Sequence, residues 1–310
     1  MKTAICLMGP TASRKTDIAI SLCKRFPCEL ISVDSALVYR GMDIGTAKPD
    51  AETLRRTPHR LIDIRDPEDS YSAGDFVRDA RREMGATFSA GRVPLLVGGT
   101  MMYFRALIDG IAELPSADAD IRASIDAEAQ QLGWPAMHGR LTEIDPIVAN
   151  RIDANDRQRI QRALEVHMVS GKPLSEWQEE AASSVDRDVR FIKLALQPAT
   201  RNVLHERIEK RLNLMLNNGF LEEVKVLHQR TGLTAEHSSM RAVGYRQLWQ
   251  YLDGECTLQQ ARDKALFATR QLAKRQITWL RSESEMRSFD PLEAGAIDAI
   301  SSCLIEFLES

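Results

Sequence analysis

The first chemically distinctive segment is Gly9-Pro10-Thr11-Ala12-Ser13-Arg14-Lys15-Thr16, which follows an apolar run and precedes a helical pattern. Its spacing is nearly that of a phosphate-binding loop, in which backbone N–H groups and a helix N-terminus surround a polyphosphate. Lys15 is the candidate cation for the phosphate, and the Thr16 hydroxyl is the candidate ligand for Mg²⁺. The segment predicts a polyphosphate site; the alternative is an ordinary strand-to-helix turn.

The loop departs from this pattern at Arg14, where the pattern has glycine. A long charged side chain could narrow the loop and weaken catalysis, since glycine allows backbone conformations that other residues avoid. It could instead turn outward and add a cation, or be an accidental change. All three interpretations are open at this stage.

Two further polar side chains follow apolar runs. Asp34 comes directly after residues 29–33, and Thr100 follows residues 93–97 through Gly98 and Gly99. Asp34 is a candidate magnesium partner or general base, with a helix N-cap as the alternative. The Thr100 hydroxyl is a candidate phosphate donor, at a position where ATP-hydrolysing relatives of such folds often carry an aspartate.

The elements that must position these side chains alternate between strand and helix patterns. Apolar runs at residues 4–8, 29–33, 61–64 and 93–97 are each followed by a turn and a helical pattern. Runs of this kind suit strands buried on both faces of a parallel sheet, with ligands bound at the carboxyl ends of the strands. We therefore expect an α/β fold with a P-loop NTPase-like parallel sheet flanked by helices.

The chain changes character in its middle. Residues 116–189 show helical periodicity alone, which predicts an all-helical insertion domain, whereas residues 191–196 return to a strand pattern. The expected organisation is an α/β core of residues 1–115 and 190–310 with a helical C-terminal region, interrupted by the insertion at 116–189.

Composition sets few limits on function. The 310 residues are 44% hydrophobic and carry a formal net charge of -3, so no global charge indicates a nucleic-acid or membrane surface. The N-terminal sequence has neither a signal-peptide pattern nor an apolar span, and the five cysteines lack zinc spacing. We expect a cytoplasmic protein with reduced, mostly buried thiols.

Basic charge is nevertheless concentrated locally. Between Arg241 and Arg281 there are eight basic and three acidic side chains, a local net charge of +5, interleaved with aromatic rings. This mixture is typical of single-stranded RNA binding, and the alternative is a solvated helix face with aromatic core contacts. A second basic cluster comprises Arg157, Arg159 and Arg162, in which Gln158, Gln161 and Arg162 share one helix face. The aromatic residues of the first region are Tyr245, Trp249, Tyr251, Phe267 and Trp279.

Together with several longer strings, these motifs resemble the bacterial tRNA dimethylallyltransferases, also called tRNA isopentenyltransferases. The further strings are Gly41-Met42-Asp43-Ile44-Gly45-Thr46-Ala47-Lys48-Pro49, Pro58-His59-Arg60-Leu61-Ile62-Asp63-Ile64, residues 159–166, Arg241-Ala242-Val243-Gly244-Tyr245-Arg246 and Lys274-Arg275-Gln276-Ile277-Thr278-Trp279-Leu280-Arg281. The resemblance extends over nearly the whole chain.

The resemblance implies a Mg²⁺-dependent transfer of a dimethylallyl group from dimethylallyl diphosphate to N6 of the adenosine immediately 3′ of the anticodon, with release of pyrophosphate. It implies that Asp34 is the base at the adenine amine, that Gly9 to Thr16 bind the diphosphate, and that Thr16 helps to hold Mg²⁺. It also assigns catalytic assistance to Lys15, Thr100 and Arg122.

The resemblance further implies that the insertion domain and three other segments contact the anticodon stem-loop of tRNA, and that the chain is a monomer without a membrane partner. The implied tRNA contacts are Asp34, Ser35, Ala36, Leu37, Gln158, Arg159, Ile160, Gln161, Arg162, Arg241, Ala242, Val243, Gly244, Tyr245, Arg246, Lys274, Arg275, Gln276, Ile277, Thr278, Trp279, Leu280 and Arg281.

Two alternative functions are compatible with the same loop. One is an ATP-dependent kinase of a nucleoside or small metabolite, which the absence of an acid after residues 93–97 and the basic C-terminal third disfavour. The other is a tRNA-binding relative whose catalysis is weakened by Arg14.

Overall fold

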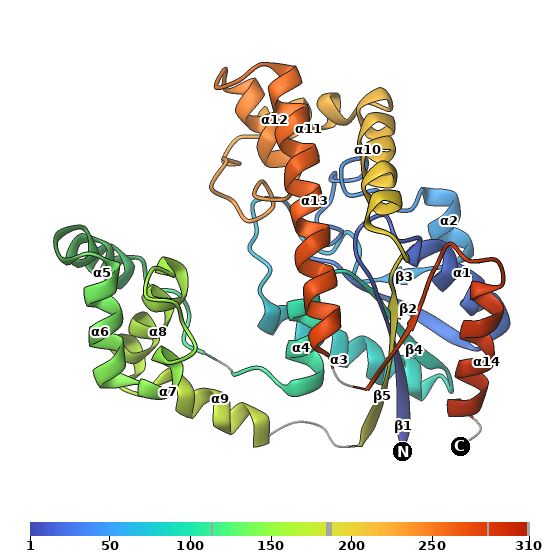
Figure 1. Ribbon diagram of the computed structural model, residues 1–310, viewed down its shortest axis with the longest axis horizontal. Helices are drawn as coiled ribbons and strands as arrows, with labels where there is room; N and C mark the ends of the chain where they lie inside the picture. Colours follow the sequence, from blue (N-terminus) through green and yellow to red (C-terminus); the bar gives the residue numbers. More distant parts are fainter. Residues whose placement is uncertain (113, 184–187, 284, 309–310) are drawn as a thin grey trace. The chain divides into compact units, whose positions relative to one another are not determined.

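The computed structural model describes residues 1–112, 114–183, 188–283 and 285–308 (Figure 1). The chain divides into two compact units, the first made of Met1–Leu107 and Arg187–Ser310 and the second of Ile108–Asp186. The limits expected for the insertion, residues 116 and 189, stay predictions.

Unit 1 contains a six-stranded sheet in the order β3-β2-β4-β1-β5-β6, and every neighbouring pair is parallel. In the central strand, Ile5 lies opposite Leu95 on one side and Ile192 on the other. The residues Ala4 to Met8 are fully buried, as expected for a strand covered on both faces. The predicted parallel α/β fold is confirmed. The strands are β1 Lys2–Met8, β2 Cys28–Val33, β3 His59–Arg60, β4 Val93–Gly98, β5 Val189–Leu196 and β6 Met286–Phe289.

Two strands differ from the sequence-based expectation. The strand predicted at residues 61–64 is wrong, because Leu61 and Asp63 have φ angles of 63° and 56°, which a strand does not allow. The short strand β3 lies just before them. At the other edge, β6 extends the sheet where helix alone was expected, and its two exposed central residues, Arg287 and Ser288, leave no continuous apolar run.

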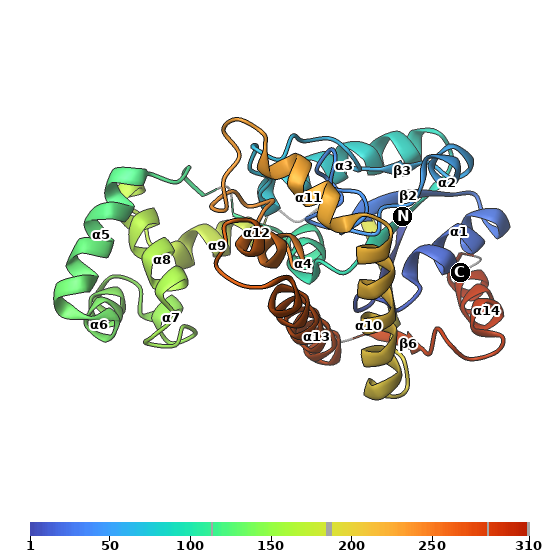
Figure 2. The ribbon, with the colours of Figure 1, turned by 90° about the horizontal axis from the view of Figure 1, so that it is seen from above.

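The helices of unit 1 cover the sheet. Helices α1 and α14 lie side by side in both views (Figures 1 and 2), and Ile18 and Leu22 of α1 share a core with Ile300 and Leu304 of α14 and with the strands. A second cluster of buried side chains joins α10, α13 and Ala12 of the phosphate loop. The helices are α1 Lys15–Arg25, α2 Ala51–Arg56, α3 Ala73–Ser89, α4 Met101–Asp109, α10 Arg201–Asn217, α11 Phe220–His228, α12 Tyr245–Leu252, α13 Leu258–Ser282 and α14 Ala296–Leu308.

Unit 2 has its own small core. Ile125, Leu141, Ile160 and Leu164 are buried together between its helices, each at the inward position of a helical repeat. The helices are α5 Ala119–Leu132, α6 Trp134–Ile144, α7 Pro146–Ala149, α8 Arg157–Ser170 and α9 Leu174–Ser183.

Over the described residues, none of the helices combines the length and the apolar character needed to span a membrane. All five cysteines are free thiols, and Cys6, Cys28 and Cys303 are buried. Burial raises the pKa of the Cys28 thiol to about 12, so this thiol is unreactive near neutral pH. The expectation of reduced and mostly buried cysteines is confirmed.

Candidate active site at the phosphate loop

The phosphate loop connects β1 to α1 and keeps a glycine-like backbone despite its sequence. Arg14 is the N-cap of α1 with φ 62° and ψ 22°, and Ala12 also has a φ of 62°. This left-handed region costs a residue with a side chain about 1 kcal/mol relative to glycine. The backbone turn of the motif is therefore formed at a small cost in strain.

The Arg14 side chain turns away from the interior of the loop. Its Nε atom lies 3.6 Å from Oδ2 of Asp17, and its Nη1 atom donates to the Pro291 carbonyl at 3.4 Å. The side chain is 41% exposed. Of the three interpretations of Arg14, the structure shows the outward one.

Within the phosphate loop, the ammonium group of Lys15 is largely desolvated. Its Nζ atom donates to the Pro10 carbonyl at 2.6 Å. Burial, together with the charge of Arg211, lowers the pKa of Lys15 to about 7, while Asp34 opposes the shift. The hydroxyl of Ser13 is also buried and has no hydrogen-bond partner within the described part of the chain. An anionic oxygen bound here would stabilise the Lys15 charge and accept from Ser13.

Two further cations on α10 were not predicted from the sequence: Arg207 reaches the phosphate loop, and Arg211 reaches the neighbouring loop of residues 41–49. The Arg207 Nε atom donates to the Ala12 carbonyl at 2.9 Å, and the Arg211 Nη2 atom donates to the Thr46 carbonyl at 3.3 Å. Burial lowers the pKa of Arg211, Asp34 raises it and Arg207 lowers it, which indicates that these charges act on one another. The available signal was a pair of arginines four residues apart, which share a helix face.

One carboxylate accepts several hydrogen bonds from the loop of residues 41–49. Glu223 of α11 accepts the backbone N–H groups of residues 43–45 at 2.7–3.1 Å and the Tyr245 hydroxyl at 2.5 Å. Because this loop supplies the Thr46 carbonyl, Glu223 indirectly holds the acceptor of Arg211. The motif of residues 41–49 therefore helps to position Arg211 in the cationic site.

Asp34 and Thr100 lie at the carboxyl ends of the neighbouring strands β2 and β4. Asp34 Oδ1 accepts the N–H groups of Ala36 at 2.9 Å and Leu37 at 3.3 Å. The Ser35 N–H donates to Thr100 Oγ1 at 3.0 Å. The Asp34 carboxylate thus caps its own turn, and because it has two oxygens this role is compatible with chemistry at Oδ2.

The predicted RNA-contacting residue Gln276 has a different environment. It is 8% exposed, and its amide bonds to the backbone at Thr11 and Gly99. Elsewhere on α13, Lys274, Arg275, Thr278 and Arg281 are exposed, whereas Leu280 is buried. The segment from Lys274 to Arg281 therefore has an outer charged side and an inner side.

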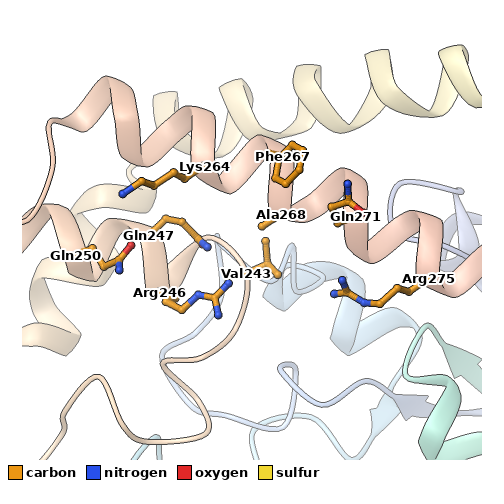
Figure 3. A pocket seen from close by; sticks show the side chains of 9 residues that line it. All are labelled: Val243, Arg246, Gln247, Gln250, Lys264, Phe267, Ala268, Gln271 and Arg275. Carbon is orange, nitrogen blue, oxygen red and sulfur yellow. The ribbon is translucent and has the colours of Figure 1, made fainter. Parts of the chain in front are cut away.

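A groove of about 550 Å³ lies between α12 and α13. Figure 3 shows Lys264, Phe267, Gln271 and Arg275 following one another along α13, with Arg246 and Gln250 opposite them. Phe267 is 64% exposed, an unusual position for a phenyl ring. The groove offers three cations and one ring to an anionic, ring-containing ligand.

Two of the rings interpreted as RNA stacking platforms are core residues, so that interpretation is wrong for them. Tyr245 is fully buried against Phe220, and Trp249 is 5% exposed. Over the described residues, three of the eight basic residues of this region have acidic partners: Arg241 pairs with Glu236, and Arg262 and Arg270 pair with Glu209. For these residues the alternative interpretation, a solvated helix face with aromatic core contacts, holds.

In unit 2, Arg122 is held by Glu165, a residue that sequence reasoning missed. The carboxylate of Glu165 is fully buried and accepts Arg122 Nε at 2.9 Å, Arg122 Nη2 at 3.0 Å and Arg162 Nη1 at 2.7 Å. Burial opposes ionisation, but these hydrogen bonds keep the pKa of Glu165 below its ordinary value. On the same helix as Arg162, Gln158 and Arg159 are exposed and Ile160 belongs to the core. The roles predicted for Arg122 and for Gln158 to Arg162 stay predictions.

A parallel sheet, a loop between β1 and α1, and a partly buried lysine within that loop define a P-loop-type α/β protein with a candidate phosphate site. The cations on α10 and the carboxylate after β2 distinguish its site from a bare phosphate loop.

Comparison with known proteins narrows this class. Residues 37–283 match the family described as IPP transferase. The chain is 50% identical over 319 residues to tRNA dimethylallyltransferase 2 of Hahella chejuensis, covering 99% of this chain and 96% of the relative. It is 56% identical over 285 residues to the tRNA dimethylallyltransferase of Paraburkholderia xenovorans, covering 91% and 90%. The crystal structure of the tRNA isopentenylpyrophosphate transferase of Bacillus halodurans matches with a TM-score of 0.73 at 36% identity, covering 99% and 97%. The chain belongs to the IPP transferase family.

Proposed function

We propose that this chain transfers a dimethylallyl group from dimethylallyl diphosphate to N6 of the adenosine immediately 3′ of the anticodon in tRNA and releases pyrophosphate. The observation that carries the proposal is the partly buried cationic site of Lys15, Arg207 and Arg211 beside Asp34, in a chain of the IPP transferase family. The donor and the anticodon stem-loop of tRNA are the partners, and we expect the active form to be a monomer. A tRNA substrate implies activity in the cytoplasm.

At the donor end, the three cations and the first turn of α1 would hold the diphosphate. Negative charge grows on pyrophosphate as the bond from C1 to oxygen breaks, so these groups stabilise the transition state more than the ground state. The loop residues fit this role because the buried Ser13 hydroxyl and the Lys15 ammonium both lack an anionic partner in the described structure.

The cofactor of this proposal is Mg²⁺. Over the described residues, no cluster of three or more His, Cys, Asp or Glu side chains could hold a metal ion. This fits an ion held by diphosphate oxygens, water and the Thr16 hydroxyl, because Mg²⁺ commonly keeps several waters at phosphate sites. When bound, it would neutralise charge on the leaving pyrophosphate.

At the acceptor end, Asp34 would take the proton that leaves the adenine amine as the new bond to carbon forms. The adenine must first be unstacked, which favours a loop over a duplex. The groove between α12 and α13, with Arg246, Lys264, Arg275 and Phe267, is the proposed contact for the RNA backbone and an unstacked base.

The test is mass spectrometry of tRNA after incubation with the chain, dimethylallyl diphosphate and Mg²⁺. We expect one dimethylallyl group on the adenosine next to the anticodon. Asp34→Asn keeps the Oδ1 acceptor of the turn but removes the base, so single-turnover transfer should fall by about 10²- to 10⁴-fold while tRNA affinity is retained. Asp50→Asn is the matched control, because Asp50 also caps a turn through its side chain, at Thr53 of α2.

Transfer by Asp34→Asn at the parent rate would show that Asp34 is not the base. Absence of the product with the parent chain, together with transfer of the ATP γ-phosphate without tRNA, would replace the proposal with a kinase.

A further inference from the structure

One side-chain amide joins three segments of the site. Gln276 Oε1 accepts the Thr11 N–H at 2.9 Å, and Gln276 Nε2 donates to the Gly99 carbonyl at 2.8 Å. Thr11 belongs to the phosphate loop after β1, Gly99 to the turn after β4, and Gln276 to α13. The amide is buried, although Lys274 and Arg275 just before it in the chain are exposed.

The geometry leaves little choice of residue at either end of this link. A Cβ atom at Gly99 would lie 2.5 Å from Gln276 Nε2 and 3.2 Å from the Gly9 carbonyl oxygen, so a glycine permits the approach. At position 276 the side chain must accept one hydrogen bond and donate another. An amide does both, whereas an ionised carboxylate only accepts and a thioether does neither well.

The link continues toward the proposed base. Gly99 is followed by Thr100, whose hydroxyl oxygen accepts the N–H of Ser35, the residue after Asp34. The two strand ends that carry the phosphate loop and the proposed base are thus connected through the Gln276 amide, the turn at Gly99 and the Thr100 hydroxyl. The Thr11 N–H is bonded to Gln276, so in this arrangement it is not free to donate to the diphosphate that this loop is proposed to bind.

We propose that Gln276 is a positioning residue for the phosphate loop and not an RNA contact. Its amide holds the loop against the turn at Gly99 and Thr100, which fixes the position of the bound diphosphate relative to the Asp34 carboxylate. This inference rests on the proposed function, because it assumes that the loop binds a diphosphate.

The experiment measures binding of inorganic pyrophosphate with Mg²⁺ by calorimetry to the full chain and to three variants. Gln276→Met removes both hydrogen bonds at similar volume and should weaken binding about tenfold, the cost of an unsatisfied buried group. Gln259→Met is the control, since Gln259 is exposed on the first turn of the same helix and bonds only to Asp263 in the described structure. It should bind like the parent.

The variant Gln276→Glu gives a pH-dependent affinity, which distinguishes positioning through these two hydrogen bonds from a purely structural role. Its carboxylate cannot donate to Gly99, but the protonated carboxyl can donate there and accept from Thr11 at once. We therefore expect the pyrophosphate affinity of this variant, relative to that of the parent, to recover as the pH falls from 8 to 5. The ratio to the parent is used because pyrophosphate itself titrates in this range. Gln276→Met should show no recovery. Thermal unfolding at each pH separates loss of fold from loss of binding.

The inference is overturned, with the proposed function intact, if the parent binds pyrophosphate and both Gln276 variants bind equally well. It is also overturned if Gln276→Glu stays weak at every pH while folded, because the two hydrogen bonds then do not set the affinity. A parent chain that binds no pyrophosphate refutes the proposed function and this inference with it.

Discussion

The desolvation of Lys15 in the proposed diphosphate-binding loop should make the stability of the protein depend on pH in a specific direction. Burial, then the neighbouring Arg211, lowers the pKa of Lys15 from 10.5 to about 7, against an opposing effect of Asp34. In the unfolded chain the lysine recovers its ordinary pKa. The perturbations are therefore a change of pH and the variant Lys15→Met, which removes the titrating group at similar length.

Between pH 7 and 10.5 the unfolded chain holds a proton that the folded chain has lost. The free energy of unfolding therefore rises with pH across this window, by up to about 1.4 kcal/mol per pH unit. The contribution is complete above the pKa of the unfolded chain and is lost as the pH falls toward the folded value. From pH 8 to pH 9.5 it amounts to about 2 kcal/mol.

Urea unfolding of the parent and of Lys15→Met at pH 7, 8, 9 and 9.5 measures this contribution as a difference between the two chains. The difference should rise with pH by the stated amount, and Lys24→Met, an exposed lysine on the last turn of α1, should give a flat difference. Pyrophosphate binding near pH 8.5 should return a proton to Lys15, seen by calorimetry in two buffers of different ionisation enthalpy. A flat difference for Lys15→Met would refute the reasoning.

Two further predictions concern Arg14 and Tyr245. Arg14→Gly relieves the left-handed backbone strain but raises the conformational entropy of the unfolded chain. These effects oppose each other, so the free energy of unfolding should change by less than about 1 kcal/mol. Donor turnover should stay near that of the parent. A large gain in turnover in a single-turnover assay would mean that Arg14 obstructs the loop. Tyr245→Phe removes one buried hydrogen bond to the Glu223 carboxylate and should lower the free energy of unfolding, measured in urea, by about 1–2 kcal/mol. No measurable loss would show that this bond adds nothing net.

The parts of the fold that could be predicted are those whose sequence pattern is local. Strands β1, β2, β4 and β5 each contain mostly apolar residues, because both faces of a parallel sheet are buried. Strands β3 and β6 lie at the two edges, are short and carry polar residues, so no run marks them. The left-handed residues after β3 were invisible because neither Leu61 nor Asp63 is a glycine.

The residues of the candidate site also divide into those that a local sequence pattern marks and those that it does not. The phosphate loop, Asp34 and Thr100 are marked by motif and by their places after strands, and the structure brings these strand ends together. Arg207 and Arg211 became visible only once α10 was packed against the loop, which no local pattern encodes. The burial of Tyr245 likewise depends on Phe220 and Glu223, which lie more than twenty residues earlier in the chain.

The phosphate site has a particular order of synthesis, because its components are far apart in the chain. The loop emerges from the ribosome early, Arg207 and Arg211 follow only after the whole helical insertion, and Gln276 comes last. Domains fold during synthesis as their segments become available. A nascent chain that still lacks α13 therefore has the loop and the α10 arginines but not the Gln276 amide, and tight capture of a diphosphate should begin only after α13 has been synthesised.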